Sequence, residues 1–223
     1  NNLFYFDHVP LQTNSITVEK PDGSAAEVQN PHTGKYRSTF DVHIDQPGTW
    51  KIGSQRIGVA GSYMQNGERQ RLPRGANPAD LANLIPQGAT EIELSESNSR
   101  NQIFVTLGAP TDTVLQASGK GLEMVPVTHP VDMVAGEEAT LRFLVDGAPA
   151  NGVKLTIIPG GSRYRDDPMQ MDLVTDQAGE VKVTWPEAGM YWLEAETSDK
   201  KTTIPGATTR NLGYVSTLEV MLP

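Results

Sequence analysis

The sequence contains no cysteine, which excludes disulfides, thiolate metal sites and cysteine nucleophiles. No apolar run approaches the roughly 18 residues that a membrane-spanning helix needs, so we predict a chain that does not cross a membrane. Aromatic residues make up only 6% of the chain, whereas it holds 21 glycines and 16 prolines. This composition is typical of a chain rich in turns and strands with few long helices.

Charge and length set further limits. The chain has 18 lysines and arginines against 27 aspartates and glutamates, a net charge of −9. We expect no nucleic-acid partner, because phosphate binding needs a basic face. A chain of 223 residues is long for one small sandwich and fits two domains of roughly 100 residues each. We predict a first domain over residues 1–118, with a long insert near 55–90, and a second over residues 119–223.

One pattern occurs twice and indicates the architecture. A glycine turn opens a strand of alternating apolar and polar residues, and a second turn leads into a strand that carries an aromatic residue. The copies cover residues 33–52 and 178–193. A period of two places Phe40, Val42 and Ile44 on one face of the first strand. In the second copy the same period places Val181, Val183 and Trp185 on one face. Each copy predicts a hairpin with one apolar face, as in an immunoglobulin-like or transthyretin-like sandwich.

The remaining pattern completes an all-β prediction of two β-sandwich domains in tandem. Strands are expected at residues 3–6, 15–19, 36–44, 49–54, 91–95, 102–107, 122–127, 139–145, 153–158, 171–175, 180–185, 190–197 and 215–222. Between 55 and 90 the alternation fades, which predicts a long hairpin or loop and then one short helix over 77–85. Asn77 is its expected N-cap, with Pro78 as the first helical residue. Residues 117–121 are the expected flexible linker.

Four histidines are candidate metal ligands, because imidazole and carboxylate groups suit nickel, iron, zinc or copper. Asp7 and His8 follow an aromatic strand and supply two such groups. His43 lies between two aspartates on the polar face of its strand. His32 sits in a turn, and His129 lies near the start of the second domain, facing the predicted boundary. A bound divalent transition-metal ion is one interpretation, and solvent-facing or connecting histidines are the other.

A second cluster surrounds an aromatic residue with positive charge. Arg163 and Arg165 flank Tyr164, and guanidinium groups present planar donors that fit a carboxylate, a phosphate or a chelated ligand. These three residues form a candidate ligand-binding site. Two aspartates follow directly, and they allow the alternative of a self-paired surface loop.

Known enzyme signatures are missing from the sequence. It contains no Gly-x-Ser-x-Gly elbow, phosphate loop, dinucleotide fingerprint or His-Glu-x-x-His motif. A Ser/His/Asp triad is assembled in space and leaves no such signature. Because none of the four histidines has a recognisable catalytic setting, we expect no enzymatic activity.

Several segments resemble a family of bacterial exported proteins. They are residues 3–10, 32–40, 104–111, 126–130, 159–166 and 184–195. The chain is thereby similar, over essentially its whole length, to domain-of-unknown-function family 4198, also called NikM-like. The resemblance implies a periplasmic protein with a signal peptide that is associated with transition-metal uptake, of nickel or iron, and flavin-carrying and membrane redox partners. Family members usually carry a histidine-containing segment before the motif that begins here at Leu3, and this sequence lacks it.

These observations lead to one expectation and two alternatives. We expect a non-enzymatic periplasmic accessory or binding protein that assists metal uptake by binding a metal ion, a metal chelate, or an inner-membrane transporter or redox component. A strip of exposed aromatic residues would instead favour a carbohydrate-binding or adhesion module. An exposed apolar patch with no pocket would favour a structural partner in a membrane-associated redox complex.

Overall fold

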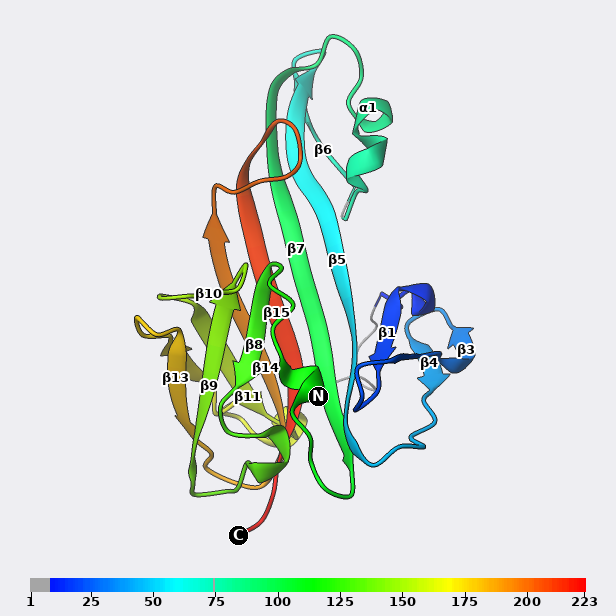
Figure 1. Ribbon diagram of the computed structural model, residues 1–223. Coiled ribbons are helices and arrows are strands. Elements are labelled where there is room, and N and C mark those ends of the chain that lie inside the picture. Colours follow the sequence, from blue (N-terminus) through cyan, green and yellow to red (C-terminus); the bar gives the residue numbers. More distant parts are fainter. Residues whose placement is uncertain (1–8, 74) are drawn as a thin grey trace.

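A computed structural model describes residues 9–73 and 75–223 (Figure 1). The fold is all-β with one short α-helix among these residues, as the sequence predicts. The strands are β1 (Ile16–Glu19), β2 (Ala25–Ala26), β3 (Gln29–Thr33), β4 (Ser38–Asp41), β5 (Gly48–Gln65), β6 (Glu68–Arg71), β7 (Thr90–Leu107), β8 (Leu122–Pro126), β9 (Glu138–Val145), β10 (Ala148–Pro149), β11 (Lys154–Pro159), β12 (Met171–Val174), β13 (Glu180–Thr184), β14 (Gly189–Asp199) and β15 (Ala207–Val220). The helices are α1 (Leu81–Leu84) and the 3₁₀-helices η1 (Thr13–Ser15), η2 (Pro78–Asp80), η3 (Thr113–Leu115), η4 (Pro130–Asp132) and η5 (Ser162–Tyr164). In this part of the chain no helix has the length and apolar character needed to cross a membrane.

One large sheet runs through the molecule. Its strands follow the order β12-β11-β14-β15-β7-β5-β1-β2, and β6 pairs with β5. β7 and β15 are parallel neighbours inside this sheet, whereas β5 with β7 and β14 with β15 are antiparallel. A smaller sheet of β8, β9, β10 and β13 covers one face, and β3 pairs with β4 beside β1 (Figure 1).

Three apolar cores fill the spaces between these layers. The main core lies between the large sheet and the four-stranded sheet and contains Phe143 and Trp185. A second core packs α1 and the end of the β5–β7 ribbon around Val59 and Leu94. A third core, around Trp50, lies where the two-stranded sheet covers β1 and β5. The ribbon of β5 and β7 therefore contributes to packing along its whole length.

The large sheet contains strands from both sides of the predicted domain boundary. β7 precedes residue 118, and its parallel neighbour β15 follows residue 119. The segment expected to be a flexible linker is fastened, because the Glu123 carboxylate accepts hydrogen bonds from the backbone N–H groups of Ser118, Gly119 and Lys120. The division into two domains at residues 118 and 119 stays a prediction.

β5 and β7 are longer than the sequence pattern predicts. Each spans 18 residues, so the strands expected at 91–95 and 102–107 are one strand. The alternation fails there because the inward positions of β7 hold buried polar residues, Glu96, Asn98 and Arg100. The predicted insert is strand up to Gln65, followed by a hairpin to β6 and the short helix. Asn77 caps η2, the 3₁₀ turn that leads into α1, since its side chain accepts the Ala79 N–H.

The two copies of the repeat do not form hairpins, contrary to the prediction. β4 pairs with β3 and β13 pairs with β9, whereas β5 and β14 lie in the large sheet. The predicted faces are nonetheless present. Phe40, Val42 and Ile44 pack toward the third core, and Val181 and Val183 are buried in the main core.

A corner in each copy explains why the strands do not pair. The Trp50 indole N–H donates to the Gln46 carbonyl at 2.9 Å, and the Tyr191 hydroxyl donates to the Glu187 carbonyl at 2.8 Å. Both rings are fully buried and reach four residues back. The glycine two residues before each ring has a positive φ, a conformation that favours glycine. Each corner therefore turns the chain from one sheet into another.

We expect Tyr191→Phe to lower the free energy of unfolding by about 1–3 kcal/mol, because it removes the hydrogen bonds that the hydroxyl of the buried Tyr191 makes with the Glu187 backbone. Urea unfolding measures this loss. Tyr164→Phe makes the same chemical change at a side chain that is 78% exposed, and its effect should stay within about 0.5 kcal/mol. Equal effects of the two substitutions would show that the corner hydrogen bond adds no stability.

Candidate functional site

The described part of the chain does not gather the predicted metal ligands. Asp7 and His8 lie outside the described residues. His32 in β3 and His43 after β4 are exposed. Within residues 9–73 and 75–223, no group of three or more histidine, aspartate or glutamate side chains could hold a metal ion. The metal roles of these residues stay predictions.

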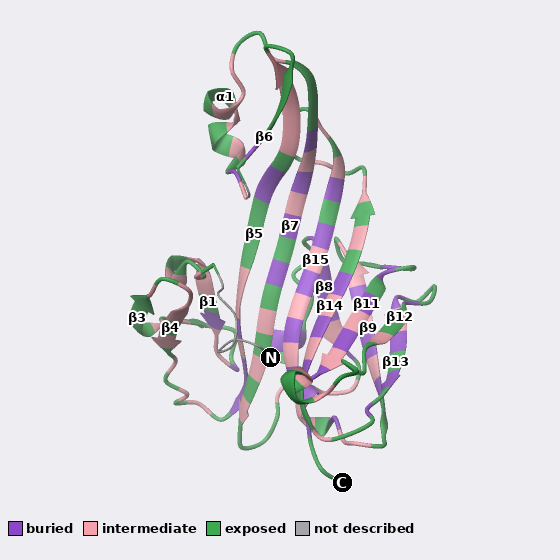
Figure 2. Cartoon of the chain, turned by 180° about the vertical axis from the view of Figure 1, so that it is seen from behind, coloured by how far each residue is buried: buried purple, intermediate pink, exposed green. Residues whose placement is uncertain are grey.

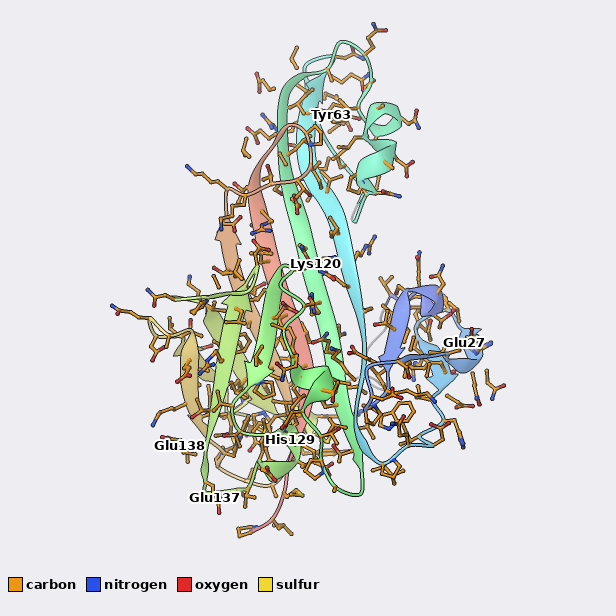
Figure 3. All side chains as sticks on the ribbon, viewed as in Figure 1. Glu27, Tyr63, Lys120, His129, Glu137 and Glu138 are labelled. Carbon is orange, nitrogen blue, oxygen red and sulfur yellow. The ribbon has the colours of Figure 1, made fainter. Side chains whose placement is uncertain are left out.

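His129 is built into the fold (Figure 3). Its Nδ1 accepts the Val131 N–H at 3.2 Å, so Nε2 carries the ring hydrogen and donates to Thr49 Oγ1 at 3.1 Å. Thr49 is fully buried, and its hydroxyl also accepts the Thr111 N–H and lies 3.0 Å from Thr106 Oγ1. Both ring nitrogens of His129 therefore have partners inside the protein.

This histidine fastens one end of a short connecting segment. Residues 129–135, which we call the strap, contain η4 and lie in the connection from β8 to β9. At the other end the Met221 N–H donates to the Met133 carbonyl at 2.8 Å, and the Ala135 N–H donates to the Met221 carbonyl at 2.9 Å. The strap thus connects β5, through Thr49, with the end of β15.

β7 and β15 separate beside the strap. Their parallel pairing ends at Gln102 and Ser216, although β7 continues to Leu107 and β15 to Val220. Both views show the two ribbons diverging toward this end (Figures 1 and 2). A cavity of about 520 Å³ lies here, and residues of both strands, of the strap and of β14 line it. We call this cavity the gap.

The walls of the gap are mainly apolar and accessible. Ile103, Val105, Met190 and Met221 line it, and each is between 37% and 46% exposed. Exposed apolar surface that surrounds a concavity marks interaction sites more often than isolated exposed residues do. The alternation in residues 102–107 is the sequence signal for this apolar wall. It predicts a strand, but it does not show that the outer face of that strand is exposed.

The predicted ligand-binding loop serves in part to hold the second corner. Arg165 donates to the Glu187 carboxylate at 3.0 Å and to the Pro159 carbonyl at 2.9 Å. Arg165 therefore pairs with Glu187 rather than with the aspartates beside it. Arg163 and Tyr164 lie on the surface. A ligand-binding role for this loop stays a prediction.

A polar groove of about 610 Å³ crosses the outer face of the large sheet, the face seen in Figure 2. Glu194 and Glu196 line it together with Lys154. Partial burial raises the pKa of Glu194, and the nearby charge of Glu196 raises it further. The two carboxylates alone do not supply a set of ligands that would define a metal site.

Two buried arginines join the layers along the paired part of β7 and β15. Arg100 of β7 donates to the Glu123 carboxylate of β8 at 2.9 Å, with both side chains less than 10% exposed. Burial by itself raises the pKa of Glu123, but hydrogen bonds from Ser118 and Gly119 and the charge of Arg100 outweigh it and hold the pKa below its ordinary value. The carboxylate is therefore charged at neutral pH.

Arg210 of β15 holds a second pair of carboxylates. It donates to Asp146 at 2.6 Å and to Asp199 at 2.5 Å. Hydrogen bonds from Arg210 lower the pKa of both aspartates, and the two carboxylates raise the pKa of Arg210. This network ties the turn after β9 to β14 and β15.

Comparisons with known proteins agree with the sequence resemblance. The profile of a family described as a domain of unknown function (DUF4198) matches residues 1–199. No curated protein matches the chain.

We expect His129→Ala to lower the free energy of unfolding by about 1–3 kcal/mol, because it removes one partner of the buried Thr49 hydroxyl and the side-chain acceptor of the Val131 N–H. Chemical denaturation measures this loss. His43→Ala removes an exposed imidazole and should change stability by less than about 0.5 kcal/mol. A neutral His129→Ala would contradict the fastening of the strap.

We expect Glu123→Gln to lower the free energy of unfolding at pH 7 by roughly 3–5 kcal/mol, because it leaves the Arg100 charge buried without its counter-charge. Since the pKa of Glu123 is lowered in the folded protein, its stabilisation is complete above the ordinary value of 4.5 and is lost as the pH falls through the lower folded value. The variant should therefore lose less stability than the parent below that pH. Unfolding curves at several pH values measure both effects.

Glu138→Gln is the matched control, since its pair with Lys182 lies on the surface with side chains 51% and 69% exposed. This change should cost less than about 1 kcal/mol. Equal losses for the two variants would contradict the burial argument.

Proposed function

Since the chain belongs to the DUF4198 family, we propose that it is a non-enzymatic accessory protein of the periplasm that assists the uptake of a transition metal, nickel or iron. The resemblance of its motifs to NikM-like exported proteins supports both the compartment and the metals. The absence of catalytic motifs from the sequence supports a binding role.

The gap is the observation that carries this proposal. It is a concave, mainly apolar site of about 520 Å³ at one end of the large sheet. The walls that the solvent reaches include two methionines, and methionine side chains adapt to varied partners. A surface of this kind supports contact with a protein, such as a transporter or redox component, rather than capture of a bare ion.

The positions of the histidines also favour contact with a partner protein over capture of a bare ion. His129 uses both ring nitrogens within the fold, and His32 and His43 lie in exposed positions that the described structure does not bring into a set of ligands. On this proposal the protein assists uptake through a partner, and the partner or a chelate carries the metal.

A carbohydrate-binding or adhesion module receives less support. Tyr191 is buried and Trp192 is half-buried, and Tyr164 is the one largely exposed aromatic side chain among the described residues. The strip of exposed aromatic residues expected of such a module is therefore not found in that part of the chain. A purely structural redox partner was expected to show an apolar patch with no pocket, whereas the apolar surface here encloses one.

Metal accumulation tests the proposal. In a bacterium that makes this protein naturally, we expect removal of its gene to lower nickel or iron accumulation several-fold under metal limitation, and the parent gene to restore it. Radioactive nickel and iron measure the uptake. Unchanged accumulation of both metals, with zinc, cobalt and copper measured alongside, would overturn the proposed function.

Calorimetric titration of the purified protein with nickel, cobalt, zinc, copper and iron(II) separates direct binding from a docking role. Alanine variants of His32, His43 and His129 should keep the parent affinity for each ion within about threefold. A tenfold or greater loss of affinity for an ion in one of these variants would contradict the proposal that a partner or a chelate carries the metal. His8→Ala tests the remaining histidine among the predicted ligands.

A further inference from the structure

The two strands that border the gap each have an edge that pairs with no neighbouring strand. Residues 103–107 of β7 pair with β5 on one side, and residues 217–220 of β15 pair with β14 on one side. In the described structure neither segment pairs with a strand on the side that faces the gap. Because backbone N–H and C=O groups point alternately to both sides of a strand, each segment presents unpaired groups to the gap.

The gap is closed at one end and bordered on its inner side. The ladder between β7 and β15 closes one end at Gln102 and Ser216. Toward the other end, the bridge between Val134 and Met221 joins the strap to β15. Pro130 and Val131 of the strap line the inner side, and the hydrogen bond of His129 to Thr49 holds the strap there. The opening therefore faces outward, with four or five residues of strand on either side.

One extended segment would present side chains to both faces of this gap. The side chains of a strand alternate between its two faces, so one set would contact Val131 inside and the other would lie between Met190 and Met221 outside. In peptide recognition by strand addition, main-chain hydrogen bonds to an exposed sheet edge give affinity, and pockets for alternate side chains give specificity.

The charges around the gap define the flanks of that segment. Glu219 lines the gap, and Asp132 ends η4 beside it. Of the described residues that line the gap, none is a lysine or arginine. The whole chain carries a net charge of −9. Lysine or arginine residues on either side of an apolar segment would complement this charge and speed its association.

We propose that the gap binds an extended segment of a partner protein, alternately apolar and flanked by basic residues, which adds as a strand between β7 and β15. This inference rests on the proposed function and names the contact through which the accessory protein meets its partner. The segment completes the sheet where its ladder stops, and its apolar side chains cover Ile103, Val105 and the two methionines.

The test uses a fluorescein-labelled peptide of sequence KKVTVTVKK and the whole protein. Fluorescence anisotropy should show micromolar binding. A second peptide, KKVTPTVKK, has the same charge but carries a proline in place of the central residue, which removes an N–H group. It should bind at least tenfold more weakly. Hydrogen exchange should slow at least tenfold in residues 103–107 and 217–220 when the first peptide binds.

Two variants locate the site, and a third controls for charge. Val105→Lys and Met190→Lys should each weaken the first peptide at least tenfold, because they place a cation in the gap. Val174→Lys adds the same charge on β12 at a side chain that is 60% exposed and lies outside the gap, and it should change the affinity less than threefold. Unfolding curves identify any variant that does not fold. If one of the two gap variants does not fold, the peptide affinity of the other one tests the site.

Three results would overturn the inference. Equal binding of the two peptides would mean that charge alone attracts them. Binding without slower exchange beside the gap would place them elsewhere. Binding that occurs only after deletion of residues 1–8 would make this chain's own terminus, and not a partner, the occupant. None of these results alters metal accumulation in the deletion strain, so failure of the inference and failure of the proposed function are distinguishable.

Discussion

The parallel ladder between β7 and β15 is the interaction on which the rest of the structure depends. It lies inside the large sheet, with β5 on one side and β14 on the other. The smaller sheet, the strap and the segment that contains α1 all pack on strands that this ladder joins. Its two strands are separated by residues 108–206, so the ladder closes a long loop and gains its stability only when the intervening strands are in place.

Buried charge fixes how the layers sit on this ladder. Arg100 and Arg210 project from its two strands and meet Glu123 and Asp146 of the opposite layer. A buried guanidinium without a counter-charge is costly, whereas the same group with hydrogen-bonded carboxylates is tolerated. A shift of one layer by a single residue would break both sets of pairs together. The arginines therefore select one arrangement of two apolar faces that would otherwise tolerate several.

The same polar residues limit what the sequence reveals. The all-β class, the short helix with its Asn77 cap and most strands of the second half follow from alternation and turn residues, which are local. β7 was predicted as two pieces because Glu96, Asn98 and Arg100 occupy inward positions that alternation reserves for apolar residues. The repeat was predicted as hairpins because a turn between two alternating strands looks the same whether they pair or enter different sheets. Tertiary partners decide both cases.

The candidate site shows this limit more sharply. The sequence singles out His129 for its place near the predicted boundary, but one of its two hydrogen bonds depends on Thr49, 80 residues away. The alternation predicts Ile103 and Val105 in a strand, but only the place where β15 leaves β7 determines that the strand edge beside them is unpaired. A site made where a ladder stops has no motif, because its residues are ordinary strand residues and its chemistry lies in unpaired backbone groups. In an all-β protein without cysteine or a cluster of ligands among its described residues, the ends of strand pairing are therefore the first places to look for function.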